Sequence, residues 1–442
     1  MLMQLAYEFA KNRLVTYFNS MTKEFSQQYL KQMKDTNGII FLDNCLDDYE
    51  AVKLLMKSNV QFVGCDRDIR YENLAYLLNS EGMYFKKIDI SEIDDYDTQK
   101  IIDSIPSNLV KNYISSRQDK TIFDLLRSHI DVSKLEGRIA DMVSSNKDKF
   151  KIPTELFLMI CYSHSCGIPV SFDMVYSYCN NYTADYKTIY KYINEIGSMI
   201  KDAFGSDFQY LNDVNFDEQD YYKCRSRYVA ELIIDKIRDM NFLRRVIISF
   251  FQNIPESKIC RFDIFRRKAF DADLMVNLFP NPNEGEDFYN MCRNIDNSAF
   301  ICQQAALYLS RKHRYKEAFK WIEDAKSRHN SFSIENTHAI IMFNANLHQA
   351  ECGDTSVLAL LYESMDILKK CFEADRRKGF HAKVFADQAI KIYEFYGFEN
   401  SEKYLVIAFE WLEDVRNAPE HSYRTRKDMN RLYFRLKEIL AY

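Results

Sequence analysis

The sequence predicts a mainly helical protein with a short α/β segment near its N-terminus and helical repeats in its C-terminal half. Three observations predict this class. The 442 residues include only 11 glycines and 7 prolines, whereas turn-dense β-sandwiches and barrels need these residues repeatedly. Apolar residues follow helical spacing almost everywhere after residue 91. Only residues 36–105 alternate short apolar runs with helical segments, as parallel strands joined by helices do.

Composition excludes several classes of protein. Hydrophobic residues make up 47% and charged residues 28% of the chain, which is typical of globular proteins. The formal net charge of −5 gives no general attraction to nucleic acid or to anionic membranes. No signal peptide or membrane-length apolar run is found. The eleven cysteines include no CxxC pair, so we expect reduced thiols and a cytoplasmic protein.

The α/β segment, residues 1–90, opens with a stretch, Met1 to Met33, that has a helical pattern. Ile39 to Leu42 is a continuous apolar run between Asn-Gly and Asp-Asn, which predicts a strand buried on both faces. A helix over 47–58 and a second strand over 60–64 follow, and after another helix we expect a third strand over 83–90. This βαβαβ order requires a parallel sheet with right-handed crossovers.

Two helical domains are predicted next. Residues 91–150 contain short helical patterns, and we interpret them as a helical lid. Residues 151–238 show helices over 156–164, 171–179 and 186–200, a polar stretch with a hairpin pattern over 207–222, and a helix from Arg225. Three helices, a small wing and a further helix are the order of a winged-helix domain, which is how we interpret this region.

Residues 239–442 are predicted to form paired amphipathic helices of the tetratricopeptide type. In Ser298 to Asn330, small and apolar residues recur where two helices of such a hairpin meet closely, at Ala306, Ala318, Ile322 and Ala325. Residues 334–372 and 378–417 repeat the two-helix plan more weakly. A compact helical bundle would show the same spacing, but we favour an α-solenoid.

Two strand ends carry candidate site residues. Asp43 follows the buried run Ile39 to Leu42, and at the carboxyl end of a parallel strand such a carboxylate can hold Mg²⁺ on the phosphates of a nucleotide. This is the pattern of a Walker-B strand. The second strand ends in Gly64-Cys65-Asp66-Arg67, where Arg67 is placed to read a terminal phosphate as a sensor residue. Ordinary strand ends of an α/β sheet would also account for both.

The order of these features resembles the STAND NTPases, the signal-transduction ATPases related to NACHT and NB-ARC proteins. The segments Gly167 to Asp173 (GIPVSFD) and Arg225 to Glu231 (RSRYVAE) are similar to STAND modules of bacterial antiphage defence proteins. The resemblance covers about residues 35–330. It implies a partial P-loop NTPase core, a helical lid, a winged helix and a helical sensor, with an effector domain preceding the ATPase. It also implies ATP or ADP with Mg²⁺ as ligands, and Asp66, Arg225 and Arg227 as further nucleotide contacts.

The sequence departs from this family in ways that bear on activity. No glycine is followed by lysine, so the phosphate-binding motif GxxxxGK with Ser or Thr is absent. The residue after Asp43, commonly an acid that activates water, is Asn44, and an amide cannot take the proton. Asp47 or Asp48 would have to substitute for it. We therefore expect that this chain alone does not hydrolyse ATP, and that a missing N-terminal part supplies the central strand and the phosphate loop.

The resulting hypothesis is the regulatory and sensor portion of a prokaryotic STAND-type protein in antiphage defence. A protein trigger would bind the C-terminal helices, and activation would favour an oligomer. Two alternatives stay open, namely a non-enzymatic α-solenoid scaffold and a winged-helix regulator that binds DNA. DNA binding is the weaker one, because the expected recognition helix from Tyr186 to Ile200 carries only Lys187 and Lys191. A basic run from Arg424 to Lys437 is expected to be a solvated capping helix or a contact with an acidic partner or nucleic acid.

Overall fold

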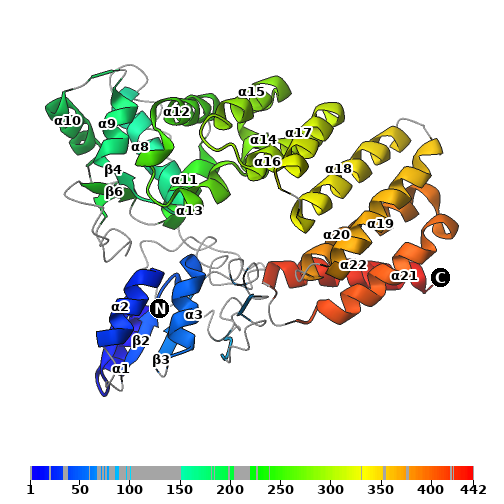
Figure 1. Ribbon diagram of the computed structural model, residues 1–442, viewed down its shortest axis with the longest axis horizontal. Coiled ribbons are helices and arrows are strands. Elements are labelled where there is room, and N and C mark those ends of the chain that lie inside the picture. The colour runs from blue at the N-terminus through cyan, green and yellow to red at the C-terminus, as the bar shows by residue number, and fades with distance from the viewer. Residues whose placement is uncertain are drawn as a thin grey trace. The chain divides into compact units, whose positions relative to one another are not determined.

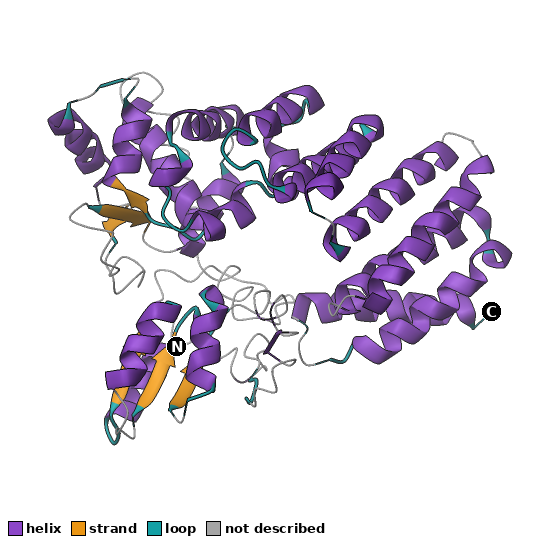
Figure 2. Cartoon of the chain, viewed as in Figure 1, coloured by secondary structure: helices purple, strands orange, loops and turns teal. Residues whose placement is uncertain are grey.

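The computed structural model shows a mainly helical chain with two small sheets (Figures 1 and 2). It divides into two compact units. The first unit consists of residues 1–83, 203–219 and 247–442, and the second unit consists of residues 84–202 and 220–246. The structure describes residues 2–18, 21–32, 38–58, 60–66, 71, 74, 77–78, 85–88, 96, 100, 151–180, 182–183, 185–197, 200–203, 220–224, 227–237, 239–329, 331–351, 355–374, 378–418, 421 and 423–441.

The N-terminal α/β part contains a three-stranded parallel sheet in the order β1-β2-β3 (Figure 2). Ile39 of the central strand pairs with Val15 on one side and with Gln61 on the other. Its elements in chain order are α1 (Leu2–Ala10), β1 (Val15–Phe18), α2 (Lys23–Gln32), β2 (Ile39–Leu42), the 3-10 helix η1 (Cys45–Asp47), α3 (Tyr49–Met56) and β3 (Gln61–Gly64).

This sheet confirms two predicted strands and corrects the third. β2 and β3 lie where the sequence predicted them. The third strand, however, is β1, within a stretch predicted to be helical, and residues 85–88 of the strand expected over 83–90 are not in a strand. The flank of β2 that we expected a missing N-terminal part to fill is therefore paired with β1. The four residues of β1 are a short and weak signal for a strand, and pairing with β2 stabilises their extended conformation.

The continuous apolar pattern of β2 is explained by helices on both faces of the sheet. Ile40 and Leu42 pack in a cluster with residues of α2 and α3, whereas Ile39 and Phe41 pack with Ala6 of α1. All four side chains of β2 are buried. Because β2 is covered on both faces and paired on both edges, its carboxyl end is held rigidly.

The second unit contains the expected three helices and a small antiparallel sheet. Its elements are α8 (Lys151–Ser165), β4 (Val170–Ser171), α9 (Phe172–Cys179), α10 (Tyr186–Ile196), β5 (Ile200–Asp202), β6 (Tyr221–Cys224) and α11 (Arg227–Lys236), with strand order β4-β6-β5. The side chains of Ser171 and Asp185 cap α9 and α10, which explains where these helices begin. Most of the predicted hairpin lies outside the described residues, as does nearly all of the predicted lid over 91–150.

The described residues from 240 onward form a series of helices (Figure 1). They are α12 (Met240–Asn253), α13 (Phe262–Ala269), α14 (Ala272–Leu278), α15 (Pro282–Cys292), α16 (Ala299–Arg311), α17 (Tyr315–Arg328), α18 (Phe332–Glu351), α19 (Leu358–Ala374), α20 (Lys378–Tyr396), α21 (Phe398–Val415) and α22 (Tyr423–Leu440). The three predicted helix pairs are confirmed as α16 with α17, α18 with α19, and α20 with α21.

Small residues lie where these helices meet. Ala306 of α16 and Ala318 and Ala325 of α17 are fully buried, as are Ala386 and Ala408 of the α20–α21 pair. Each helix from α16 to α22 contacts the next one in the chain, and α16, α18, α20 and α22 also contact one another in succession. This nearest-neighbour packing is consistent with a helical solenoid. Within the described part of the chain, no helix is both long and apolar enough to cross a lipid bilayer.

Candidate functional site

The carboxyl edge of the parallel sheet brings Tyr17, Asp43 and Cys65 together. Asp43 and Cys65 directly follow β2 and β3, and Tyr17 lies within β1. The Tyr17 hydroxyl donates to Asp43 Oδ2 at 3.5 Å. Burial, and then the negative charge of Asp43, raise the pKa of Tyr17 to about 12. Burial followed by the charges of Asp43 and Asp66 also raises the pKa of the Cys65 thiol, so Asp43 is the centre of a partly buried acidic site.

Asn44, the residue expected in place of a catalytic acid, shapes the turn after β2. Its φ of 46° and ψ of 43° are left-handed, a conformation that asparagine tolerates better than most residues. Its backbone N–H donates to Asp43 Oδ1 at 3.0 Å. Asp66, which is also expected to contact nucleotide, accepts the backbone N–H of Leu46 at 2.7 Å and so holds the same turn from the end of β3.

Asp48 joins the N-termini of both crossover helices. Its Oδ1 accepts the backbone N–H of Ala51 in α3 at 3.2 Å, and its Oδ2 accepts the backbone N–H of Lys23 at the start of α2 at 3.0 Å. A second side chain, Thr22, accepts the N–H of Phe25 at 3.3 Å. Helix N-termini at this edge of an α/β sheet are where phosphates usually bind. In this protein the Asp48 carboxylate lies at the N-termini of both helices.

The described residues do not test the three arginines expected at the site. Arg67 and Arg225 lie outside the described residues. Arg227 lies in α11 of the second unit, where its Nε is 3.4 Å from Glu231 Oε1. The predicted nucleotide contact of these arginines stays a prediction.

The fit of Mg²⁺ and a nucleotide to this edge is therefore partial. Asp43 offers a carboxylate, and Mg²⁺ commonly binds through one or two carboxylates together with phosphates and water. The described residues contain no group of three or more His, Cys, Asp or Glu side chains that could hold a metal. Phosphates fit this edge less well than Mg²⁺, because Asp48 accepts from the N-termini of both α2 and α3 and its negative charge repels an anion there. No catalytic step through a nucleotide follows from these residues.

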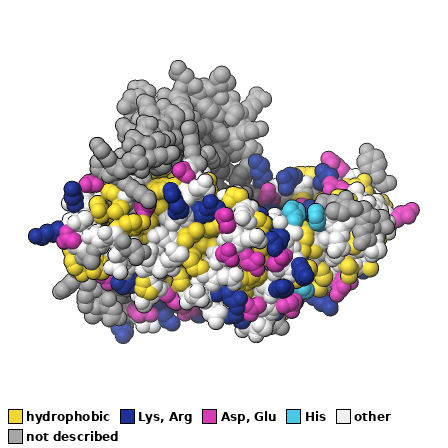
Figure 3. Space-filling model, turned by 90° about the horizontal axis from the view of Figure 1, so that it is seen from above, with side chains coloured by type: hydrophobic (Ala, Val, Ile, Leu, Met, Phe, Trp, Pro, Cys, Tyr) yellow, Lys and Arg dark blue, Asp and Glu magenta, His cyan; other side chains and the backbone are white. Residues whose placement is uncertain are grey.

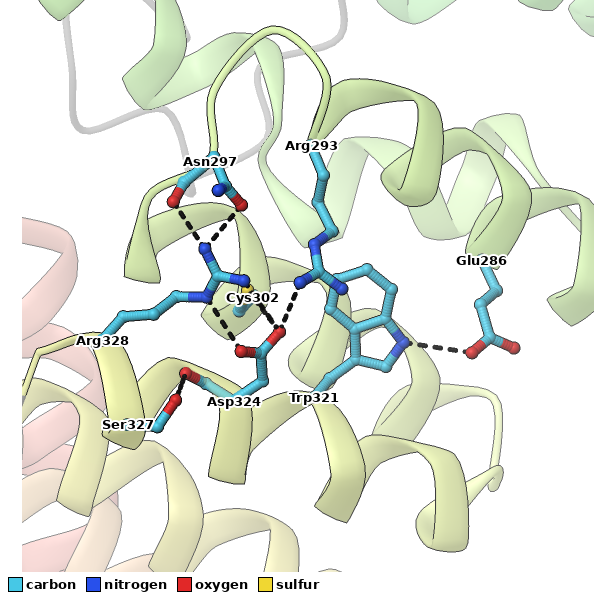
Figure 4. A network of polar contacts seen from close by, with 8 residues as sticks. All are labelled: Glu286, Arg293, Asn297, Cys302, Trp321, Asp324, Ser327 and Arg328. Carbon is cyan, nitrogen blue, oxygen red and sulfur yellow. Dashed lines mark hydrogen bonds and ion pairs between the residues drawn. The ribbon is translucent and has the colours of Figure 1, made fainter.

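A second polar cluster lies between α15, α16 and α17 (Figure 4). Asp324 accepts from Arg293 Nη2 at 2.7 Å and from Arg328 Nε at 2.9 Å, and Arg293 also lies over the Trp321 ring at 4.9 Å. Burial alone would raise the pKa of Asp324, but hydrogen bonding from Arg328 and the charge of Arg293 hold it below its usual value. Burial and the Asp324 carboxylate raise the pKa of Cys302 to about 11.

This cluster joins helices and performs no evident chemistry. Asp324 is neutralised by two guanidinium groups, and the high pKa of Cys302 disfavours the reactive thiolate. Trp321 Nε1 donates to Glu286 of α15 at 3.0 Å, and Arg328 donates to the Asn297 carbonyl at 2.7 Å. These contacts fix α17 against α15 and against the turn before α16. Asp324 is separated from Arg293 by 31 residues, so only the helical pairing predicted from sequence could have indicated the contact.

The sequence alone does not indicate the roles of three residues at this edge. It predicts a helix at Tyr17 and a reduced thiol at Cys65, and it offers Asp48 only as a candidate base. The apolar and aromatic run Val15 to Phe18, followed by Asn-Ser, is the signal that could have identified β1 and hence Tyr17.

Comparison with known proteins finds a similarity to a solved structure. No protein family model matches the chain, and no curated protein matches it. The solved structure is the crystal structure of a Signal Transduction ATPase with Numerous Domains (STAND) protein with a tetratricopeptide repeat sensor, from Pyrococcus horikoshii. The aligned region includes 94% of this chain and 68% of the Pyrococcus chain. The sequence identity is 11% and the TM-score is 0.24. A similarity of this size carries no functional argument, and only the residues and contacts of this chain can indicate what it does.

Proposed function

We propose that the chain is the regulatory and sensor portion of a STAND-type signalling protein and that its C-terminal helices bind a protein trigger. The serial packing of α16 to α22 carries this proposal. Stacked helical pairs, in which each pair contacts mainly its neighbours, provide extended surfaces that are used for binding other proteins. A prokaryotic cytoplasmic role in antiphage defence is part of the proposal and comes from the resemblance of the sequence to that family.

In this proposal the trigger acts by shifting an equilibrium between two packings of the chain. A trigger can shift that equilibrium only by its difference in affinity for the two states. We expect the trigger-bound state to favour an oligomer.

The α/β part would contribute to a nucleotide site only together with a phosphate loop from outside the described residues. ATP or ADP with Mg²⁺ would then meet Asp43, and Arg67 would lie at the end of the neighbouring strand. The partly buried carboxylate of Asp43 supports this part of the proposal. The Asp48 carboxylate at the N-termini of α2 and α3 argues against phosphate binding at those two helices. A non-enzymatic helical scaffold is the alternative, and it needs no nucleotide.

DNA binding through α10 is less well supported. Lys187 and Lys191 are exposed on this helix, but Tyr190 donates to Asp220 at 3.0 Å and stacks on Phe172 at 4.7 Å. On the part of the surface visible in Figure 3, acidic and basic side chains are interleaved with hydrophobic ones. A nucleic-acid interface usually gathers its basic side chains into one patch or stripe.

A binding screen with the intact chain tests the proposal. The chain is mixed with each member of a set of purified phage proteins, and hydrogen exchange of the chain is measured for every protein that it retains. We expect at least one retained protein to slow exchange within residues 299–440. The double variant Lys187→Glu, Lys191→Glu on α10 is the control and should bind equally. Retention of no protein, or slowed exchange only within residues 151–237, contradicts the proposal.

A further inference from the structure

The outer face of α22 differs from the rest of the helical series in its charge. One side of this helix is buried against α20 and α21 through apolar residues that include Met429 and Leu436, both fully buried. The opposite side exposes four cationic side chains and one anionic one, namely Lys427, Arg431, Arg435, Lys437 and Glu438. We call this exposed side, with Phe434, the α22 face.

Phe434 lies in the middle of the α22 face. Its side chain is 57% exposed. Lys427, Arg431, Phe434 and Glu438 follow one another at intervals of four, three and four residues, which places them on one stripe of the helix. A large exposed aromatic ring surrounded by cations is not needed to close a helical stack, for which a mixed polar surface is sufficient.

The ring of Phe434 packs against a neighbouring aromatic ring of the same helix. It meets the edge of the Tyr433 ring with centroids 5.6 Å apart. Tyr433 in turn stacks on Phe409 of α21 at 4.8 Å, and the Arg416 guanidinium lies over it at 4.0 Å. The helix surface that carries Phe434 is thus held in place before any partner binds, which lowers the entropic cost of binding.

The cations of the face are mostly available to a partner. Arg435 is paired with Glu394 of α20. Among the described residues, Lys427, Arg431 and Lys437 have no ion-pair partner. Exposed aromatic and arginine side chains are enriched among the residues that dominate binding energy at protein interfaces.

We propose that the α22 face binds an acidic segment of a partner protein, with an apolar side chain of that segment packed on Phe434. The inference rests on the proposed protein-binding function and names the surface and the chemistry of the partner. Charge complementarity selects the acidic partner, since three exposed cations attract anionic groups. Nucleic acid fits less well, because the chain has a net charge of −5 and because Phe434 occupies the centre of the face.

Selection from a random peptide library displayed on phage tests this inference. The intact chain is the target, and the recovered peptides are synthesised and their dissociation constants measured. We expect peptides rich in Asp and Glu that contain a Leu or an aromatic residue. Phe434→Ala and Arg431→Glu should each weaken them about tenfold, which corresponds to about 1.4 kcal/mol, and added salt should weaken the wild-type complex.

Matched controls separate this face from general effects. Lys370→Glu changes an exposed cation of α19, and Phe380→Ala removes a ring of α20 that is 50% exposed. Both should bind the selected peptides like the wild type, and circular dichroism melting should show that all four variants are folded. Peptides that bind the α22 variants as tightly as the wild type would overturn the inference and leave the proposed function standing. Recovery of no peptide would contradict both, and tighter binding of a single-stranded oligonucleotide at the same face would overturn the acidic-protein partner.

Discussion

Replacing Asp48 by alanine should loosen two helices at once. One carboxylate accepts the backbone N–H of Ala51 in α3 at 3.2 Å and that of Lys23 in α2 at 3.0 Å. The Asp48→Ala variant leaves both donors without this acceptor, although they lie in different helices that follow different strands. The structure therefore predicts a coupled effect on α2 and α3.

The size of the effect follows from the two hydrogen bonds. Loss of an N-cap side chain typically costs about 1 kcal/mol, and hydrogen bonds to a charged group are worth about 1.5–3 kcal/mol when partly buried. The two contacts share one carboxylate at a half-buried position. We expect the free energy of local opening to fall by about 2 kcal/mol, which is an increase of roughly 30-fold in the opening constant.

Hydrogen exchange of the intact chain, resolved by mass spectrometry, measures this change. Peptides covering residues 21–32 and 48–56 should both exchange faster in Asp48→Ala, and peptides from α16 to α22 should be unchanged. Asp48→Asn is the informative control, because the amide keeps one acceptor oxygen and loses the other. It should restore protection to only one of the two helices.

Two results would refute this reasoning. Equal exchange in wild type and Asp48→Ala would show that the carboxylate does not hold the helices. Wild-type protection of both helices in Asp48→Asn would show that the bridge between them is unimportant.

Three further predictions concern separate parts of the chain. Gly285→Ala places a methyl group against the Tyr308 ring and should lower stability by about 1–3 kcal/mol, so an unchanged melting temperature would contradict the packing. Asp324→Asn should lower the free energy of unfolding by about 1 kcal/mol at pH 7. Because the folded-state pKa of Asp324 is lowered, the difference between variant and wild type should disappear as the pH falls below about 4 and through that pKa. A difference that persists in acid would refute the ion-pair explanation. The purified chain should release no phosphate from ATP, because Asp48 closes the helix N-termini, and phosphate release that is lost in Asp43→Ala would overturn this.

Where the signal in the sequence is local, the predicted secondary structure agrees with the observed one. The run Ile39 to Leu42 is continuous and apolar because β2 is buried on both faces, and polar residues at each end marked its bounds. The helix pairs of residues 298–417 were predictable for the same reason, since helical periodicity and close-packed alanines depend on residues three and four apart. These patterns also placed Asp43 at the end of a strand.

The residues that surround Asp43, and the roles of the neighbouring acids, depend on contacts between distant segments of the folded chain. Pairing with β2 stabilises β1 as a strand, and its four residues alone are only a weak signal for one. Asp47 and Asp48 look equivalent in sequence, yet the fold brings the Lys23 amide to Asp48, 25 residues away. Asp324 and Arg293 likewise meet across 31 residues. Hydrogen bonds and ion pairs of this kind form between segments distant in the chain, so no local pattern records them, and the packing of helices on the sheet and on one another determines them.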